Sequence, residues 1–141
     1  MKRIVLDTNV IISAILNAHG SPGQILNQVL EGKLSLCLST AMVGEIRRVI
    51  RYEKMAAFFK RVEKTIEEVD EIIDKIVLLA EITPGDKQVD LIDADPDDNM
   101  VLACTLETRV DYIVSGDSHL TNLGNFEGVP ILTPRNLLGV L

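Results

Sequence analysis

The sequence predicts an α/β domain in three α/β/α layers, with a central and mostly parallel sheet. Two observations lead to this prediction. Short, almost wholly apolar segments, such as residues 4–6 and 34–38, alternate with longer segments whose apolar residues recur at helical spacing. Strands that are apolar throughout are typical of parallel sheets, because helices cover both of their faces.

The expected elements alternate along the whole chain. Pro22 follows Ser21 at a plausible first helical position, and Ser39 or Thr40 is placed to cap the helix after the second strand. In chain order we expect a strand at 4–6, helices at 9–16 and 22–32, a strand at 34–38, a helix from 40 to 50, helices at 59–76 and 97–107, strands within 112–117 and 129–134, and a short helix at 135–138.

A long amphipathic helix is expected between Phe59 and Ile76. Its apolar residues lie three and four positions apart with acids and lysines between them: Phe59, Val62, Ile66, Val69, Ile73 and Ile76. This narrow apolar seam packs within the domain, or against a second copy or a partner helix. Residues 77–82 extend the helix or form a strand.

Length and composition limit the number of domains and the location that we expect. A chain of 141 residues with 47% hydrophobic composition is expected to form a single domain, residues 1–141. Its apolar stretches are shorter than a membrane span and its start does not resemble a signal peptide, so we expect a cytoplasmic protein without membrane contact. Cys37 and Cys104 stand far apart in apolar surroundings, which favours core positions over a redox pair or metal site.

The charge is unevenly distributed. A net charge of −7 argues against a general nucleic-acid binder, yet the segment from Glu45 to Lys64 has seven basic residues and three acidic ones. This basic strip is either a solvated helix face or a surface that contacts phosphates. Its members are Arg47, Arg48, Arg51, Lys54, Lys60, Arg61 and Lys64.

Four acids are expected at the same end of the sheet. Asp7 and Asp117 directly follow predicted strands, Asp98 begins a helix, and Glu45 lies at the edge of an apolar helix face. In parallel α/β folds the functional crevice lies beyond the carboxyl ends of the strands. Carboxylates gathered there would repel one another by about 4 kcal/mol per pair at 4 Å, unless a divalent cation neutralised them.

Each acid also has a local explanation that stays open. Asp7 suits a helix N-cap, Asp98 and its neighbours Asp95 and Asp97 suit a helix N-terminus, Glu45 suits an ion pair with Arg48, and Asp117 suits a turn. These separate roles do not require all the acids to share one end of the sheet, whereas a metal site does. Carboxylates without cysteine or histidine favour Mg²⁺ or Mn²⁺, ions suited to phosphodiester hydrolysis.

Several stretches resemble the PIN-domain nucleases, in order and over nearly the whole chain. They are "VLDTNVIISAIL", a helical Glu45, "DPDDNMVLACTLE", "YIVSGDSHL" and "PILTPRNLL". Within that family the chain resembles the toxins of toxin-antitoxin pairs (VapC-like). The resemblance implies a sheet of four or five strands and a metal-dependent ribonuclease that forms a homodimer and is inhibited by an antitoxin protein.

The resemblance also implies site residues. It assigns Asp7, Glu45, Asp98 and Asp117 as catalytic and metal-binding acids, with Asn9 and Ser115 as polar support. The periodicity of the helix does not choose between Asp97 and Asp98, and only the family spacing to "SGD" prefers Asp98.

Three functions remain in view. The leading one is a Mg²⁺- or Mn²⁺-dependent endoribonuclease, with Arg47, Arg48 and Arg51 guiding RNA to the acids. A phosphotransferase of the haloacid-dehalogenase type needs a second acid two residues after Asp7, and position 9 is Asn. The third is a non-catalytic module that binds protein or RNA. His119 is within reach of a phosphate but fits an exposed loop better, as does His19.

Overall fold

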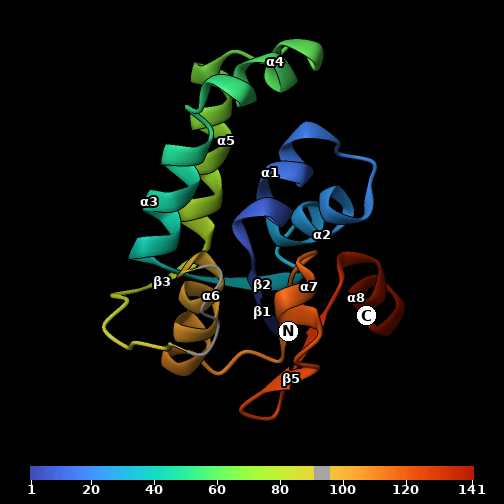
Figure 1. Ribbon diagram of the computed structural model, residues 1–141. Helices are drawn as coiled ribbons and strands as arrows, with labels where there is room; N and C mark the ends of the chain where they lie inside the picture. Colours follow the sequence, from blue (N-terminus) through green and yellow to red (C-terminus); the bar gives the residue numbers. More distant parts are fainter. Residues whose placement is uncertain (91–95) are drawn as a thin grey trace.

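A computed structural model describes residues 1–90 and 96–141, with helices packed around one sheet (Figure 1). Its elements, in chain order, are β1 (Lys2–Leu6), α1 (Thr8–Leu16), α2 (Ser21–Leu30), β2 (Leu34–Ser39), α3 (Thr40–Val49), α4 (Glu53–Arg61), α5 (Ile66–Leu79), β3 (Glu81–Thr83), α6 (Pro96–Glu107), β4 (Tyr112–Val114), α7 (Ser118–Thr121), β5 (Asn125–Phe126), β6 (Val129–Leu132) and α8 (Pro134–Val140).

The described strands form a sheet in the order β3-β2-β1-β4-β6-β5. Strands β3, β2, β1, β4 and β6 pair in parallel with their neighbours in this order, and β1 lies at the centre. This confirms the mostly parallel sheet. The short strand β5 is an antiparallel addition at the edge that the sequence analysis did not predict. Glu127 and Gly128 turn the chain between β5 and β6 with positive φ angles of 51° and 78°, as in the tight turns of two-residue hairpins.

The central strands are buried on both sides. Ile4, Val5 and Leu6 of β1 are 0% exposed although successive side chains point to opposite faces of a strand. Helix α6 packs against β1 and β2, and α8 packs against β4 and β6. The predicted arrangement of helices flanking a buried sheet is therefore confirmed.

The two cysteines belong to this core. Cys37 in β2 and Cys104 in α6 are free, buried thiols. Burial raises the pKa of both, that of Cys104 to about 12, so neither thiol ionises readily near neutral pH. This agrees with the expected core role.

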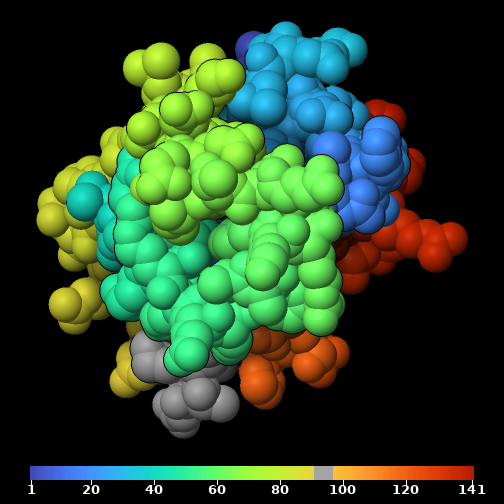
Figure 2. Space-filling view, turned by 90° about the horizontal axis from the view of Figure 1, so that it is seen from above, coloured from blue at the N-terminus to red at the C-terminus, as the bar shows by residue number. Residues whose placement is uncertain are grey.

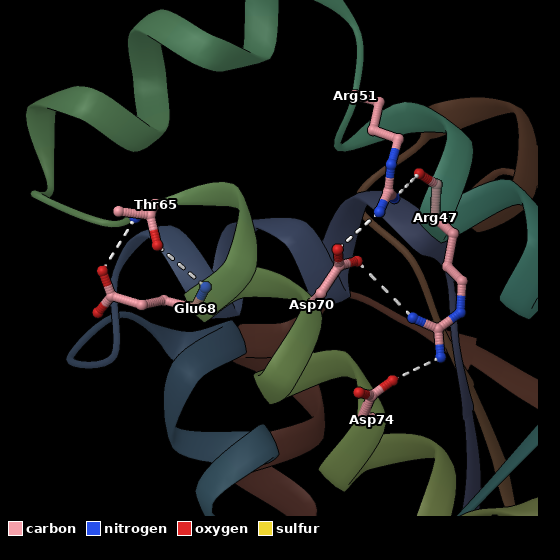
Figure 3. Close-up of polar contacts among 6 residues, drawn as sticks. All are labelled: Arg47, Arg51, Thr65, Glu68, Asp70 and Asp74. Atoms are coloured by element: carbon pink, nitrogen blue, oxygen red, sulfur yellow. Dashed lines mark hydrogen bonds and ion pairs between the residues drawn. The ribbon is translucent and has the colours of Figure 1, made fainter.

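The prediction of one helix from Phe59 to Ile76 is wrong. Helix α4 ends at Arg61, Glu63 takes a left-handed φ of 57°, and α5 begins after Thr65. The Thr65 hydroxyl accepts a hydrogen bond from the Glu68 amide at 3.1 Å, and the Glu68 carboxylate accepts one from the Thr65 amide at 3.1 Å (Figure 3). This capping box satisfies amides that a continuous helix would have bonded internally.

Most of the apolar seam packs within the domain, which was the first of its two alternatives, although Ile66 is 36% exposed. Val69, Ile73 and Ile76 of α5 are at most 1% exposed and belong to the core cluster, as does Phe59 of α4. In Figure 1, α3 and α5 extend away from the sheet beside each other, and α4 lies at their far end. After α5 ends at Leu79 the chain forms β3, so both alternatives for residues 77–82 are realised in part.

Helix α2 begins one residue earlier than expected. Gly20 is its N-cap, and Pro22 lies at the second helical position. Gly23 follows in the same turn, where an added Cβ would lie 2.5 Å from backbone atoms of Ala18 and Asn17.

The described helices include none that is both long and apolar enough to cross a membrane.

Candidate metal centre

The centre of the candidate site is the junction of β1 and β4. Leu6 pairs with Val114, and the Asp7 amide continues the ladder by donating to the Val114 carbonyl at 2.9 Å. Asp7 and Ser115 therefore leave the sheet together at the carboxyl ends of neighbouring parallel strands. Asp7 is only 5% exposed and Ser115 is fully buried.

Ser115 connects two of the predicted acids. Its hydroxyl donates to the Asp7 carboxylate at 2.8 Å and accepts a hydrogen bond from the Asp117 amide at 3.0 Å. Asp7 occupies the N-cap position of α1, yet its side chain makes no capping hydrogen bond to that helix. The N-cap explanation therefore accounts for the position of Asp7 but not for the direction of its carboxylate.

Asp117 does carry out a local role. Its carboxylate accepts a hydrogen bond from the His119 amide at 2.8 Å and caps the short helix α7. The His119 ring returns to the same carboxylate, with Nδ1 3.3 Å from an Asp117 oxygen.

Asp98 approaches from the first turn of α6. It is 2% exposed, and one of its carboxylate oxygens lies 3.9 Å from Nδ1 of His119. Within the described part of the chain, Asp98, Asp117 and His119 each offer a donor atom within 4.8 Å of the others. Asp97 is less buried, and its charge is one of the weaker influences that raise the pKa of Arg48. Asp95 lies outside the described residues.

Glu45 is buried in α3, which packs against α6. Its carboxylate is ion-paired with Arg48 one turn later, as the local explanation expected. Tyr52, and after it Glu45, raises the pKa of Arg48, so this guanidinium stays charged at any ordinary pH. Among the described donor atoms, Glu45 is not part of the group formed by Asp98, Asp117 and His119.

The other predicted arginines lie against α5. Arg51 contacts Asp70 at 2.6 Å, and Arg47 contacts Asp74 at 2.8 Å and Asp70 at 3.8 Å (Figure 3). These ion pairs connect α3 and the turn after it to α5. Arg48, with a side chain 60% exposed, is the member of the predicted trio that pairs with a candidate ligand.

The sequence also singled out Asn9 and His119. Asn9 is exposed in the first turn of α1, whereas its neighbour Thr8 is buried. His119 is exposed as expected, but it lies in α7 rather than in a loop, and its ring faces two acids. Its only sequence signal was a position two residues after Asp117.

The arrangement suits a divalent cation. Ser115 connects the buried Asp7 to the partly buried Asp117, and the buried Asp98 lies close to Asp117 and His119. Buried negative charge is costly unless it is neutralised. Oxygen donors of this kind bind hard ions such as Mg²⁺ and Mn²⁺. The residues therefore fit a metal site.

Fold and site together define a class: a parallel α/β domain with an acidic site beyond the carboxyl ends of its strands. A family model described as PIN domain matches residues 3–119, and this chain belongs to the PIN-domain family. The uncharacterized protein MJ1680 of Methanocaldococcus jannaschii is 26% identical over 121 residues, which cover 86% of this chain and 74% of that protein. Family membership suggests a nuclease that acts on nucleic acid with divalent metal.

Proposed function

We propose that this PIN domain is a Mg²⁺- or Mn²⁺-dependent endoribonuclease whose metal ligands include Asp7, Glu45, Asp98 and Asp117. The observation that supports it most directly is the hydrogen-bonded chain from buried Asp7 through Ser115 to Asp117, with Asp98 close by. Structural caps alone do not explain why acids from separate elements converge there.

Each residue has a distinct task in this mechanism. A bound Mg²⁺ or Mn²⁺ supplies an activated water at neutral pH and positive charge for the phosphate oxygens. Asp7, Glu45, Asp98 and Asp117 would hold the cation, and Ser115 fixes the direction of the Asp7 carboxylate by its hydrogen bond. Arg48 orients Glu45 and presents an exposed guanidinium to the RNA phosphate.

The RNA approaches along the part of the basic strip that is not engaged with α5. Lys54, Lys60 and Arg61 are exposed on α4, which lies on the face seen in Figure 2. Lys54 lies 6.0 Å from the Tyr52 ring centre, and Arg61 lies 5.5 Å from that of Phe58. Exposed aromatic rings beside cations suit unpaired bases and phosphates, which favours single-stranded RNA.

The chain also acts, in this proposal, as the toxin of a toxin-antitoxin pair and as a homodimer. The support is a group of exposed apolar side chains where α5 meets β3: Leu78 is 84% exposed, Leu79 53% and Ile82 40%. An exposed apolar patch of this kind is suited to a protein partner. Light scattering of the purified chain, alone and with a coexpressed neighbouring gene product, tests both assemblies.

Cleavage of labelled single-stranded RNA tests the catalytic proposal. We expect cleavage with Mn²⁺ or Mg²⁺, no cleavage in EDTA, and loss of about 100-fold or more of the rate in Asp7→Asn. Asp74→Asn, the same chemical change at an exposed residue of α5, should keep the activity. Cleavage that survives EDTA would refute the mechanism, and RNA binding without any cleavage would favour the non-catalytic module.

A further inference from the structure

We propose that His119 donates its ring nitrogen to the cation held by Asp98 and Asp117, and that this ligand makes the site select Mn²⁺ over Mg²⁺. The inference rests on the proposed metal-dependent function. It adds a ligand that is not among the four acids, and it distinguishes between two ions that a carboxylate site alone would leave equivalent.

The distances around His119 are those of a ligand set. Nδ1 is 3.3 Å from an Asp117 oxygen and 3.9 Å from an Asp98 oxygen. Around one octahedral cation with bonds of about 2.1 Å, neighbouring ligand atoms are about 3.0 Å apart and opposite ones about 4.2 Å apart. The two observed separations lie between these values, and the donor atoms of all three side chains lie within 4.8 Å of one another, so one cation can contact all three after small rotations.

The backbone holds the imidazole in this position. The His119 amide donates to the Asp117 carboxylate at 2.8 Å, while the Asp117 amide is held by Ser115 at 3.0 Å. The side chain of His119 therefore starts beside the Asp117 carboxylate, whether or not the ring makes any interaction. Few torsions remain to be ordered when the ring binds a cation, which lowers the entropic cost of recruiting it.

The exposure of the three side chains fits a site that is open to substrate. The Asp98 side chain is 3% exposed and that of Asp117 25%, whereas that of His119 is 57% exposed. The acids thus form the floor and the imidazole stands at the rim. Protein ligands on one side and open positions on the other are typical of catalytic metal sites, where water or a phosphate completes the coordination.

An imidazole changes which cation is preferred. Mg²⁺ favours oxygen ligands and retains its waters, whereas divalent transition-metal ions, including Mn²⁺, accept a nitrogen ligand more readily. Replacing one water by imidazole therefore improves the affinity for Mn²⁺ more than that for Mg²⁺. A simple ion pair between protonated His119 and Asp117 would give similar distances without a cation, and it predicts no such selectivity.

Metal titration of the protein alone distinguishes these cases. The chain has two histidines, and His19 is exposed between α1 and α2, which makes His19→Asn a matched control for His119→Asn. By calorimetry we expect His119→Asn to weaken Mn²⁺ binding about tenfold and Mg²⁺ binding much less. His19→Asn should change neither. Equal affinity ratios in wild type and His119→Asn would overturn the proposal.

Nitrogen NMR gives a second readout that does not depend on activity. With Zn²⁺ as a diamagnetic probe, we expect one ring nitrogen of His119 to shift on binding while both of His19 stay unchanged. Asp98→Asn should abolish the shift. If Asp98→Asn weakens Mn²⁺ binding but the His119 ring of the wild type shows no shift with Zn²⁺, the assignment of His119 as a ligand fails and the proposed metal site stands. If the wild type binds no divalent ion at these residues, the proposed function itself fails.

Discussion

At the scale of single residues, the Ser115 hydroxyl contacts two of the candidate ligands, Asp7 and Asp117. We expect Ser115→Ala to lower RNA cleavage about tenfold, because the Asp7 carboxylate loses the hydrogen bond that directs it. The stability cost is about 1–3 kcal/mol, since the Asp117 amide loses its acceptor. Steady-state kinetics and thermal melts measure both effects.

Two variants serve as controls for this prediction. Ser115→Thr keeps the hydroxyl and should retain most of the activity. Ser118→Ala removes a hydroxyl from an exposed residue of α7 and should leave cleavage unchanged. Equal activity of Ser115→Ala and wild type would show that Asp7 does not need this orientation.

Glu107 makes the stability of the turn after β3 depend on pH. Burial would raise the pKa of Glu107, but hydrogen bonds from the Thr83 hydroxyl and from the amides of Asp86, Lys87 and Gly85 lower it below its usual 4.5. A lowered pKa in the folded state stabilises the protein above the unfolded-state pKa, and this stabilisation is lost as the pH falls through the folded-state value.

The matching experiment compares Glu107→Gln with wild type at two pH values. We expect wild type to melt higher at pH 7, and the difference to shrink as the pH falls through the lowered pKa of Glu107, because the protonated side chain is neutral like that of glutamine. Glu71→Gln, at an exposed position of α5, should show no such pH-dependent difference. A constant difference between pH 7 and pH 3 would mean that the Glu107 charge contributes nothing.

The candidate site shows what a sequence can and cannot locate at this scale. Asp7 and Asp117 were predictable at one end of the sheet, because each follows an apolar segment expected to be a buried parallel strand, and the family resemblance added Ser115 near them. The proximity of His119 to Asp98 was not predictable, since it depends on how α7 and α6 are placed in space. Likewise, only the packing of α3 on α5 directs Arg47 and Arg51 to Asp70.

At the scale of elements, the α1–α2 corner depends on a glycine inside a helix. A Cβ at Gly23 would lie 2.5 Å from the carbonyl atoms of Ala18, and backbone cannot move away cheaply. We expect Gly23→Ala to destabilise the protein by about 1–3 kcal/mol. Gly44→Ala is the contrast, because nothing lies within 4 Å of its added Cβ and it sits inside α3.

Helix propensity determines whether Gly44→Ala is expected to stabilise or destabilise the protein. Replacing glycine by alanine in a helix stabilises by about 0.5–1 kcal/mol when there is room for the methyl group. Chemical denaturation of both variants thus gives opposite changes in the midpoint at an unchanged slope. A shared sign would contradict the argument from local space.

The elements that were predicted correctly are those with one unambiguous pattern. Residues 4–6 of β1 and 36–38 of β2 are apolar and fully buried, and Ser39 caps α3 with its hydroxyl, as expected from its type. The break between α4 and α5 was missed because helical spacing continues from Phe59 through Val62 to Ile66. The Thr65 and Glu68 pair was the local signal of a new helix start, and it outweighed the periodicity.

At the scale of the whole molecule, the proposed metal site predicts that metal binding and stability are coupled. Asp7 and Asp98 are buried and Asp117 is partly buried, and in this proposal a bound cation would relieve the repulsion among their carboxylates. Ligand linkage predicts that Mn²⁺ at a hundred times its dissociation constant adds about 2.7 kcal/mol, or a shift in melting temperature of about 8 °C. Removal of the metal with EDTA should reverse it.

Asp98→Asn separates this coupling from ordinary damage to the core. Without metal, the variant lacks one of the mutually repelling charges, so we expect it to melt at the same temperature as wild type or higher. With Mn²⁺ the order should reverse, because the variant loses most of the stabilisation that the cation gives wild type. A variant less stable than wild type in EDTA, with an undiminished response to Mn²⁺, would show that Asp98 is a structural acid and that the cation binds elsewhere.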